Sequence, residues 1–219
     1  MEGFTEEHQS KLKEAKVLVI GAGGLGSPVL LYLAAAGIGS IGIVEFDTVS
    51  LSNLNRQVLY THSDVGKSKA KLAGKIVRNV NPYCEINVLE EKWEDKERAL
   101  NIAKNYEIIV DCTDNYSSRL LTDLISRELC IPFVYGAIYN YEGQVSVFNY
   151  KGCRGYRDFI KEEPEKRQKQ VGVLGPLPGI IGSIQAVEVI KIVSGTGEVL
   201  ADKMLICSVK YNRYQVLEL

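Results

Sequence analysis

The chain has 219 residues, 46% hydrophobic and 24% charged, a composition that indicates a folded globular protein and excludes a disordered one. Its 26 basic and 27 acidic side chains leave a net charge of −1, so no overall positive charge points to nucleic-acid binding. The longest apolar stretch, 28–38, has 11 residues, against the roughly 20 that span a bilayer. The first ten residues carry three glutamates and no signal-peptide pattern, so a cytoplasmic protein without a membrane span is expected.

The first segments in chain order predict a strand, a glycine turn, a helix and a second strand. An apolar run over 16–20 leads into glycines and then into strong helix formers that end at Gly37. A buried strand is predicted over 41–46, and a helix over 65–80 is ended by Pro82. Together these segments predict a parallel strand–helix–strand unit.

The same alternation continues along the middle of the chain. Strands are predicted near 86–89, 107–111 and 132–136, and helices near 94–103 and 115–130. Five strands with four helical crossovers predict a Rossmann-like, doubly wound, mostly parallel sheet.

The last third of the chain follows a different pattern. It is predicted to form a hairpin over 139–150, a mobile charged loop over 151–171, a buried helix over 180–193, and strands over 204–208 and 214–217. Glu142 and Gly143 are the expected hairpin turn. These strands are expected to extend the sheet in antiparallel fashion, and the lack of repeats or linkers predicts one domain over 1–219.

A glycine-rich turn is the first motif that indicates a chemical role. Gly21, Gly23, Gly24 and Gly26 follow a strand and open a helix, where glycines allow the backbone to approach phosphate groups closely. Glu45 closes the second predicted strand 24 residues after Gly21, where an acid can accept a hydrogen bond from a ribose hydroxyl. These two features predict a nucleotide site without identifying the nucleotide.

Polar and cationic groups beyond the second strand favour a phosphate chain as the ligand. Segment 47–57 lies past the carboxyl end of that strand and contains Arg56, while Lys69 lies on the following helix and could project toward the same crevice. The two cations together could neutralise phosphate charge. Asp114 follows another strand and has two interpretations, the N-cap of the next helix or a ligand of Mg²⁺.

These motifs resemble the ThiF/MoeB/HesA family, bacterial relatives of ubiquitin-activating enzymes. The resemblance covers nearly the whole chain. It is carried by GAGGLGSP (21–28), EFDTVSLSNLNRQ (45–57), VGKSKA (65–70), DCTDN (111–115), GQVSVF (143–148) and GVLGPLPGIIGSIQAVEVIK (172–191).

The resemblance implies an ATP- and Mg²⁺-dependent adenylyltransferase. Its partner would be a small ubiquitin-like sulfur-carrier protein with a C-terminal Gly-Gly, activated for thiamin or molybdopterin type sulfur transfer, and the enzyme would be a homodimer. The resemblance assigns the four glycines to the phosphate turn, Glu45 to the ribose, Arg56 and Lys69 to the phosphates, and Asp114 to the metal. Asn53 and Asn115 are also assigned to nucleotide binding, and Arg119, like Asn53, matches a family position.

The sequence departs from the family at its start and before the last helix. Relatives carry an Arg-Tyr-x-x-Arg-Gln stretch, whose arginine reaches the partner subunit's site, and this sequence begins at Met1, just past that position. A missing arginine would imply slow catalysis, help from the partner or a natural chain that starts earlier. Gln168 stands where some relatives have a cysteine, so no covalent link to the carrier is expected.

The five cysteines predict neither disulfides nor a zinc site, because they are odd in number and never occur as Cys-x-x-Cys. Many relatives have two such pairs that bind zinc, and of these only Cys153 remains, with Tyr156 in its partner's place. Zinc is therefore not expected. The other four are expected to be small buried apolar side chains: Cys84, Cys112, Cys130 and Cys207.

Two other functions remain open from the residues. The glycine turn and Glu45 alone would suit an NAD-dependent oxidoreductase, but the sequence has no Tyr-x-x-x-Lys pair, and that function leaves the cations and Asp114 unexplained. The absent arginine also allows a non-catalytic binder of a ubiquitin-like partner.

Overall fold

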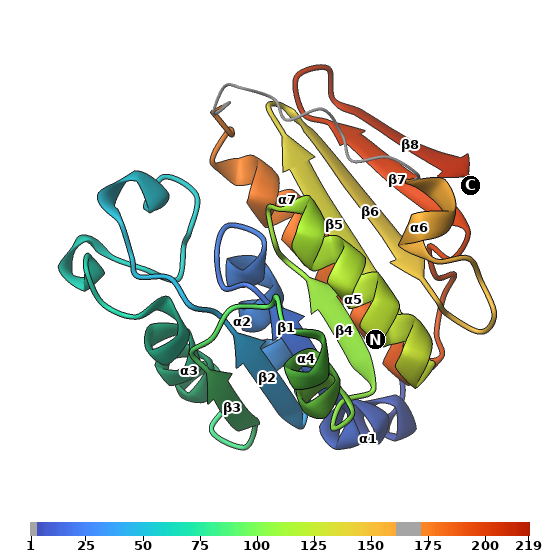
Figure 1. Ribbon diagram of the computed structural model, residues 1–219, viewed down its shortest axis with the longest axis horizontal. Helices are drawn as coiled ribbons and strands as arrows, with labels where there is room; N and C mark the ends of the chain where they lie inside the picture. Colours follow the sequence, from blue (N-terminus) through green and yellow to red (C-terminus); the bar gives the residue numbers. More distant parts are fainter. Residues whose placement is uncertain (1–3, 161–171) are drawn as a thin grey trace.

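A computed structural model describes residues 4–160 and 172–219 (Figure 1). The strands of the described chain form one sheet in the order β3-β2-β1-β4-β5-β6-β7-β8. Their bounds are β1 (Lys16–Ile20), β2 (Ser40–Val44), β3 (Glu85–Leu89), β4 (Ile108–Asp111), β5 (Phe133–Tyr139), β6 (Glu142–Phe148), β7 (Lys203–Ser208) and β8 (Arg213–Glu218). The first five pair in parallel and the last three are added antiparallel, so the predicted fold class is confirmed.

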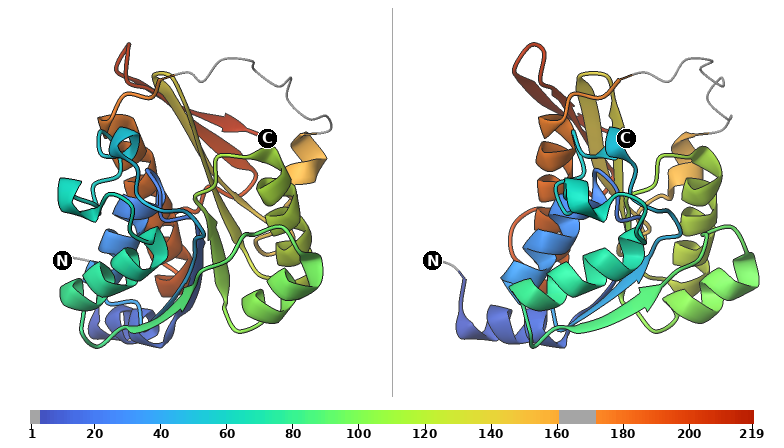
Figure 2. Two further views of the ribbon diagram at one scale, coloured as in Figure 1. Left: turned by 60° about the vertical axis from the view of Figure 1, so that its left-hand side comes forward. Right: turned by 90° about the vertical axis from the view of Figure 1, so that its left-hand side faces the viewer.

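Helices cover both faces of this sheet (Figure 2). Helices α1, α2, α3 and α7 lie on one face, and α4, α5 and α6 on the other. Their bounds are α1 (Glu6–Glu14), α2 (Gly26–Ala36), α3 (Lys69–Val80), α4 (Lys96–Ala103), α5 (Tyr116–Leu129), α6 (Tyr156–Phe159) and α7 (Pro176–Ser194). Between β2 and α3 the chain also forms two short 3₁₀ helices, η1 (Leu51–Asn53) and η2 (His62–Asp64).

The alternation of apolar side chains along β1 creates a core on each face. Val17 and Val19 pack with α2 and α7, whereas Leu18 and Ile20 pack with α4 and α5. Successive side chains of a strand point to opposite faces, and a parallel sheet covered by helices is therefore apolar throughout. This explains why the strands were recognisable as short continuous apolar runs.

The predicted hairpin turn at Glu142-Gly143 is wrong. β5 continues to Tyr139, and Tyr139 pairs directly with Glu142 across a two-residue turn at Asn140 and Tyr141. Asn140 adopts a left-handed backbone with φ of +54°, a conformation that asparagine tolerates better than most residues. Gly143 instead lies inside β6, where a Cβ would be 2.3 Å from Ile181 Cγ1 of α7.

Helix α1 was not predicted. Only Leu12 is buried among its nine residues, so the helix lacks the apolar periodicity that indicates an amphipathic helix. Its local signals are Thr5 at the N-cap and the acidic pair Glu6 and Glu7 in the first turn.

The other helix boundaries shift by a few residues. α3 begins at Lys69 rather than at 65, because the Ser68 side chain accepts a hydrogen bond from the Lys71 amide and caps the helix there. β2 ends at Val44, so Glu45 lies just beyond the strand.

Helix α7 is longer than predicted and only partly buried. Ile181, Gln185 and Val189 face the core, whereas Val187 is half-exposed. Among the described helices it is the one long and apolar enough to cross a membrane, but half of it is buried and it packs against α2, β5 and β6, as a core helix of a globular fold does.

The predicted loop over 151–171 is described only in part. Residues 156–159 form the short helix α6, and residues 161–171, including Gln168, lie outside the described residues. The assignment of a single domain over 1–219 stays a prediction.

Candidate nucleotide-binding site

The sheet has a topological switch point between β1 and β4. From β1 the chain adds β2 and β3 on one side, and it later adds β4 and β5 on the other. The helices that follow β1 and β4 lie on opposite faces (Figure 2). Doubly wound sheets bind ligands outside the carboxyl ends of the strands at such a point, and this region is here called the crevice. The glycine turn follows β1 there, and Cys112–Asn115 follows β4.

The glycine turn has no room for larger side chains at two positions. Gly21 has φ of +96°, and a Cβ on it would lie 2.8 Å from the carbonyl oxygen of Cys112. A Cβ on Gly26, the first residue of α2, would lie 2.1 Å from the carbonyl oxygen of Gly21. The glycines therefore let the turn pack closely against the end of β4 and the start of α2, and the partly exposed Gly23 and Gly24 lie at a helix N-terminus, an environment that suits a phosphate.

Glu45 supports the turn directly. Its carboxylate accepts hydrogen bonds from the amides of Ala22 at 2.9 Å, and of Phe46 and Asp47 at 2.8 Å each. The side chain is buried, and these three protein donors occupy most of the four acceptor sites of a carboxylate. Glu45 is predicted to bind the ribose. The same carboxylate already fixes the backbone of the glycine turn through these hydrogen bonds.

Arg56 lies over the glycine turn. Its Cγ would be 3.7 Å from a Cβ on Gly24, and its Nη1 donates to Ser52 O and Asn55 Oδ1 at 2.9 Å each. Asn53 Oδ1 accepts from the amide of Ser50 at 3.1 Å and caps η1, so its side-chain oxygen has a structural role in the described chain.

Gln57 is a site residue that sequence reasoning missed. Its Nε2 would be 3.3 Å from a Cβ on Gly23, and its Oε1 is buried without a hydrogen-bond partner. A buried unpartnered oxygen beside the turn fits a site where a ligand supplies a donor. The sequence feature that could have identified Gln57 is its position next to Arg56 in the polar segment 47–57.

Lys69 is the first residue of α3, not one turn inside the helix as the sequence suggested. Its side chain is 5% exposed, and Nζ lies 3.1 Å from Asp47 Oδ2. The Lys69 amide also donates to Asp47 O at 3.0 Å. Asp47 is half-exposed. The buried Lys69 ammonium group, which pairs with it, therefore lies just below the protein surface at the carboxyl ends of the strands.

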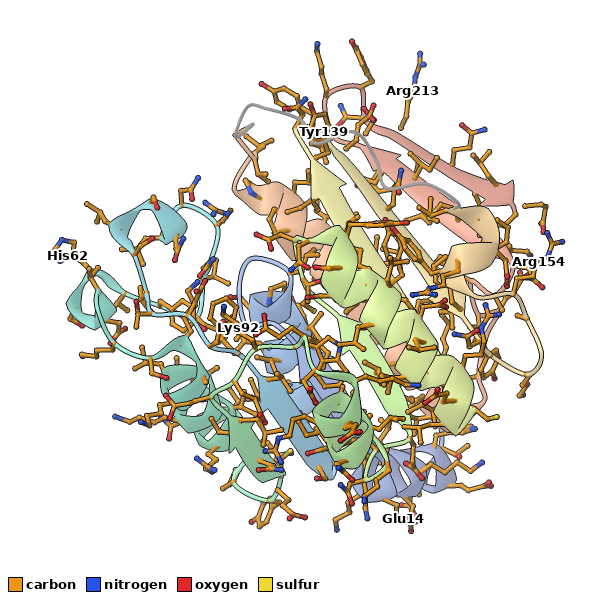
Figure 3. The ribbon with its side chains drawn as sticks, in the orientation of Figure 1. Glu14, His62, Lys92, Tyr139, Arg154 and Arg213 are labelled. Atoms are coloured by element: carbon orange, nitrogen blue, oxygen red, sulfur yellow. The ribbon has the colours of Figure 1, made fainter. Side chains whose placement is uncertain are left out.

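The segment between Glu45 and Lys69, here called the arm, projects from the body of the protein (Figure 1), with His62 at its outer tip (Figure 3). A bridge between Thr48 and Ser68 closes its base. The arm brings Arg56 back over the glycines. In the sequence, Arg56 lies 13 positions before Lys69.

Asp114 is exposed on the loop after β4, whereas Asn115 is the N-cap of α5. Asn115 Oδ1 accepts from the amide of Ser118 at 2.8 Å. The capping interpretation of Asp114 is therefore wrong, since the next residue fills that position. The nucleotide role suggested for Asn115 stays a prediction.

We expect Asn115→Ala to lower the free energy of unfolding by about 1 kcal/mol, because it removes the cap of α5. Urea denaturation followed by circular dichroism would measure this loss. Asn101→Ala, on the exposed side of α4, is the control and should change stability by less than about 0.5 kcal/mol. Equal stabilities of the Asn115→Ala and unmodified chains would contradict the capping role.

A buried ion pair lies beneath the crevice. Asp111 is fully buried, its Oδ2 lies 3.4 Å from Arg119 Nε, and its Oδ1 accepts from the Thr113 hydroxyl at 2.6 Å. Arg119 Nη2 also donates to Thr113 O at 3.0 Å. Burial raises the pKa of Asp111, and the positive charge of Arg119 opposes that shift. The pair holds the loop that carries Asp114, so Arg119 acts on the site through this loop.

The cysteines are only partly as expected. Cys84, Cys112 and Cys207 are buried, but Cys130 is exposed because it ends α5 in a left-handed conformation. Burial raises the pKa of Cys112 and raises that of Cys84 to about 11, so both remain thiols near neutral pH. Neither is suited to act as a nucleophile in sulfur transfer.

Within residues 4–160 and 172–219 no group of three or more His, Cys, Asp or Glu side chains could hold a metal ion. An all-protein metal cage is thus not formed by this part of the chain. Mg²⁺ often binds through one or two carboxylates together with substrate phosphates, and the exposed Asp114 carboxylate fits that mode.

The whole chain, residues 1–219, matches the model of the ThiF family. It is 42% identical over 209 residues to a sulfur carrier protein adenylyltransferase of Thermus thermophilus, which covers 91% of this chain and 77% of that protein. It is 47% identical over 211 residues to a probable molybdopterin-synthase adenylyltransferase of Porphyra purpurea, which covers 94% of this chain and 54% of that protein. The chain thus spans about half the length of several relatives.

Solved structures share the fold. Escherichia coli MccB with ATP superposes with a TM-score of 0.87 at 21% identity, covering 97% of this chain and 65% of that one. PaaA superposes with a TM-score of 0.84 at 27% identity, covering 97% and 66%. From the match to the family model over its full length and from its identity to these relatives, the chain belongs to the ThiF family.

Proposed function

We propose that this chain is an ATP-dependent adenylyltransferase that activates the C-terminal glycine of a small ubiquitin-like sulfur-carrier protein. The names of its relatives, a sulfur carrier protein adenylyltransferase and a probable molybdopterin-synthase adenylyltransferase, support this proposal. Because the chain spans only part of several relatives, the activity and the partner are proposals for the chain itself.

The observation that carries this proposal is that two basic residues lie beside the glycine turn. The Arg56 side chain lies against Gly24, and Lys69 begins α3 next to the turn, since the Tyr60 hydroxyl lies 2.7 Å from Ala22 O and 3.3 Å from Lys69 O. A dinucleotide site for hydride transfer has little need of two cations at this place, whereas a triphosphate gains charge neutralisation from both.

The proposed reaction needs no nucleophile from this chain. An oxygen of the carrier's terminal carboxylate attacks the α-phosphorus of ATP, a new bond to phosphorus forms, and the bond to the β-phosphate oxygen breaks to release pyrophosphate. Arg56, Lys69 and the backbone amides of the glycine turn stabilise the charge that grows on the phosphate oxygens, and the crevice holds the reactants in line. The product is the carrier's acyl adenylate.

Asp114 is proposed as the protein ligand of Mg²⁺. The ion would neutralise phosphate charge when bound. Asp114 needs no rearrangement to serve as this ligand, since the carboxylate is exposed beside the crevice and Asn115 already provides the helix cap.

The carrier is proposed to contact the antiparallel end of the sheet. Tyr139 and Arg213 lie at one end of these strands (Figure 3), and the carrier's flexible Gly-Gly tail would reach the crevice along segment 151–171, of which 151–160 is described. A homodimer is proposed as well. Tyr32 of α2 and Val187 of α7 are 55% and 50% exposed, and apolar helix faces of this kind suit a subunit contact.

Two competing functions predict different ligands. An NAD-dependent oxidoreductase would be stabilised by NAD rather than by ATP, because a ligand that binds the folded state raises the melting temperature. A non-catalytic binder of a ubiquitin-like partner would associate with the carrier and release no pyrophosphate.

The test measures ATP–pyrophosphate exchange with a candidate carrier that ends in Gly-Gly. We expect exchange only when the carrier is intact, and none with a carrier lacking its terminal glycine. Binding of the carrier with no exchange would leave the chain a binder, and stabilisation by NAD but not by ATP would overturn the proposal.

We expect Asp114→Asn to lower this exchange by about 10²-fold or more while the melting temperature stays unchanged, because the side chain is exposed and acts only through the phosphates. Glu97→Gln, exposed on α4, is the matched control and should retain full exchange. Rates for Asp114→Asn equal to those of the control would reject the assignment.

A further inference from the structure

Tyr60 is a buried titratable side chain that the proposed reaction does not use. It comes from the arm, yet its ring is only 6% exposed and packs in the core with Ala22 and Val49. Leu59 beside it is also buried, so this part of the arm is anchored in the body of the protein. A tyrosine buried in this way normally needs a partner for its hydroxyl group.

The Tyr60 hydroxyl finds its partner in the glycine turn. It donates to the carbonyl oxygen of Ala22 at 2.7 Å, and the carbonyl oxygen of Lys69 lies 3.3 Å away. The hydroxyl has a single hydrogen, so the shorter contact is the main bond. One side chain thus contacts both the turn and the first residue of α3.

Ala22 is held from two sides. Its amide donates to Glu45 at 2.9 Å, and its carbonyl accepts from Tyr60. The amide of Gly21, one residue earlier, donates to Val44 O at 2.8 Å. The peptide groups on the two sides of Ala22 are therefore oriented by fixed partners.

Tyr60 remains a hydrogen-bond donor throughout the working pH range. Burial raises the pKa of its phenol far above 10, and the negative charge of Glu45 nearby raises it further. The group therefore cannot serve as a base or carry a proton, and its contribution must come from the bond it donates.

We infer that Tyr60 is a positioning residue of the nucleotide site, which orients the glycine turn for phosphate binding and couples that turn to the start of α3 where Lys69 lies. This inference rests on the proposed function, because the ligand that the turn receives is the triphosphate of ATP. Tyr60 itself touches only the protein. Preorganised backbone donors bind an anion without the cost of ordering the turn upon binding.

The removal of the hydroxyl alone tests this role. In Tyr60→Phe the ring still fills its place, but the Ala22 carbonyl loses its buried donor. The turn should then sample other orientations. Because the amides of the turn are proposed to hold the phosphates already in bound ATP, we expect KM for ATP to rise by roughly tenfold and kcat to fall by less than that.

Tyr106→Phe is the matched control. Tyr106 is 8% exposed, its hydroxyl accepts from Asn87 Nδ2 at 3.3 Å, and it precedes β4 at the end of the sheet away from the crevice. We expect both Tyr106→Phe and Tyr60→Phe to lower the melting temperature. Tyr106→Phe should leave KM for ATP unchanged. A merely structural role for Tyr60 would make the two variants behave alike.

Amide hydrogen exchange gives a second measurement that needs no carrier and no turnover. We expect faster exchange at the amides of 21–26 in Tyr60→Phe and unchanged exchange along β2. If the unmodified chain uses ATP, but Tyr60→Phe changes neither KM for ATP nor amide hydrogen exchange at the turn, then the inference is wrong and the proposed function still stands. An unmodified chain that does not bind ATP would overturn both the inference and the proposed function.

Discussion

Replacement of Lys69 by alanine is expected to lower carrier-dependent ATP–pyrophosphate exchange by about 10²- to 10³-fold. Its ammonium group is buried at the crevice and is held by Asp47 at 3.1 Å. A cation fixed in such a place acts on phosphate charge at little cost of reorganisation and with weak screening by solvent. Because the loss concerns charge that grows during the reaction, kcat should fall more than the affinity for ATP.

Lys71→Ala is the control for this experiment. Lys71 lies two residues further along α3, and its Nζ pairs with Glu90 at 2.9 Å, but its side chain is 73% exposed. A surface ion pair of this kind contributes little, so full exchange is expected. Loss of exchange in both variants would point to general damage to α3, and retained exchange in Lys69→Ala would remove this residue from the mechanism.

Gly26→Ala is expected to lower the free energy of unfolding by about 2 to 3 kcal/mol and to abolish ATP binding. Its Cβ would lie 2.1 Å from the carbonyl oxygen of Gly21, closer than any real contact, and that oxygen belongs to the backbone. The turn must therefore move away from α2. Since the backbone amides of this turn are the proposed phosphate donors, stability and binding should fall together.

Gly179→Ala separates this steric effect from the general effect of alanine in a helix. Gly179 also lies in a helix, but a Cβ there would meet nothing within 4 Å. We expect this variant to gain about 0.5 to 1 kcal/mol, because alanine favours helix formation. Urea denaturation and ATP titration of both variants check the pair, and Gly26→Ala with normal stability would refute the close approach.

The central parallel strands β1, β2 and β4 could be predicted because they are buried on both faces. Val17 to Ile20 face two separate cores, so they appear in the sequence as one unbroken apolar run. The two-residue turn at Asn140 and Tyr141 was missed because Glu142-Gly143 is the stronger turn signal. Gly143 lies inside β6 instead, because α7 crosses β6 there and a larger side chain would collide with Ile181.

Segments near the ends of strands were less predictable. α1 has too few buried side chains to produce a periodic pattern, and it is stabilised by its contact with α7, which is distant in sequence. The sequence suggested Asp114 as a possible cap of α5, whereas the extended Asn115 fills that position and accepts from the Ser118 amide.

Chain order and residue type were enough to indicate the parallel sheet, its antiparallel extension, the glycine turn and the cations beside it, because these depend on local periodicity and on short motifs. Folding was needed to bring both Tyr60 and Glu45 to Ala22, and to leave Gln57 Oε1 without a partner. Those contacts join residues 23 to 38 positions apart. Hydrogen bonds over such separations depend on how the arm folds back onto the sheet, which no local pattern specifies.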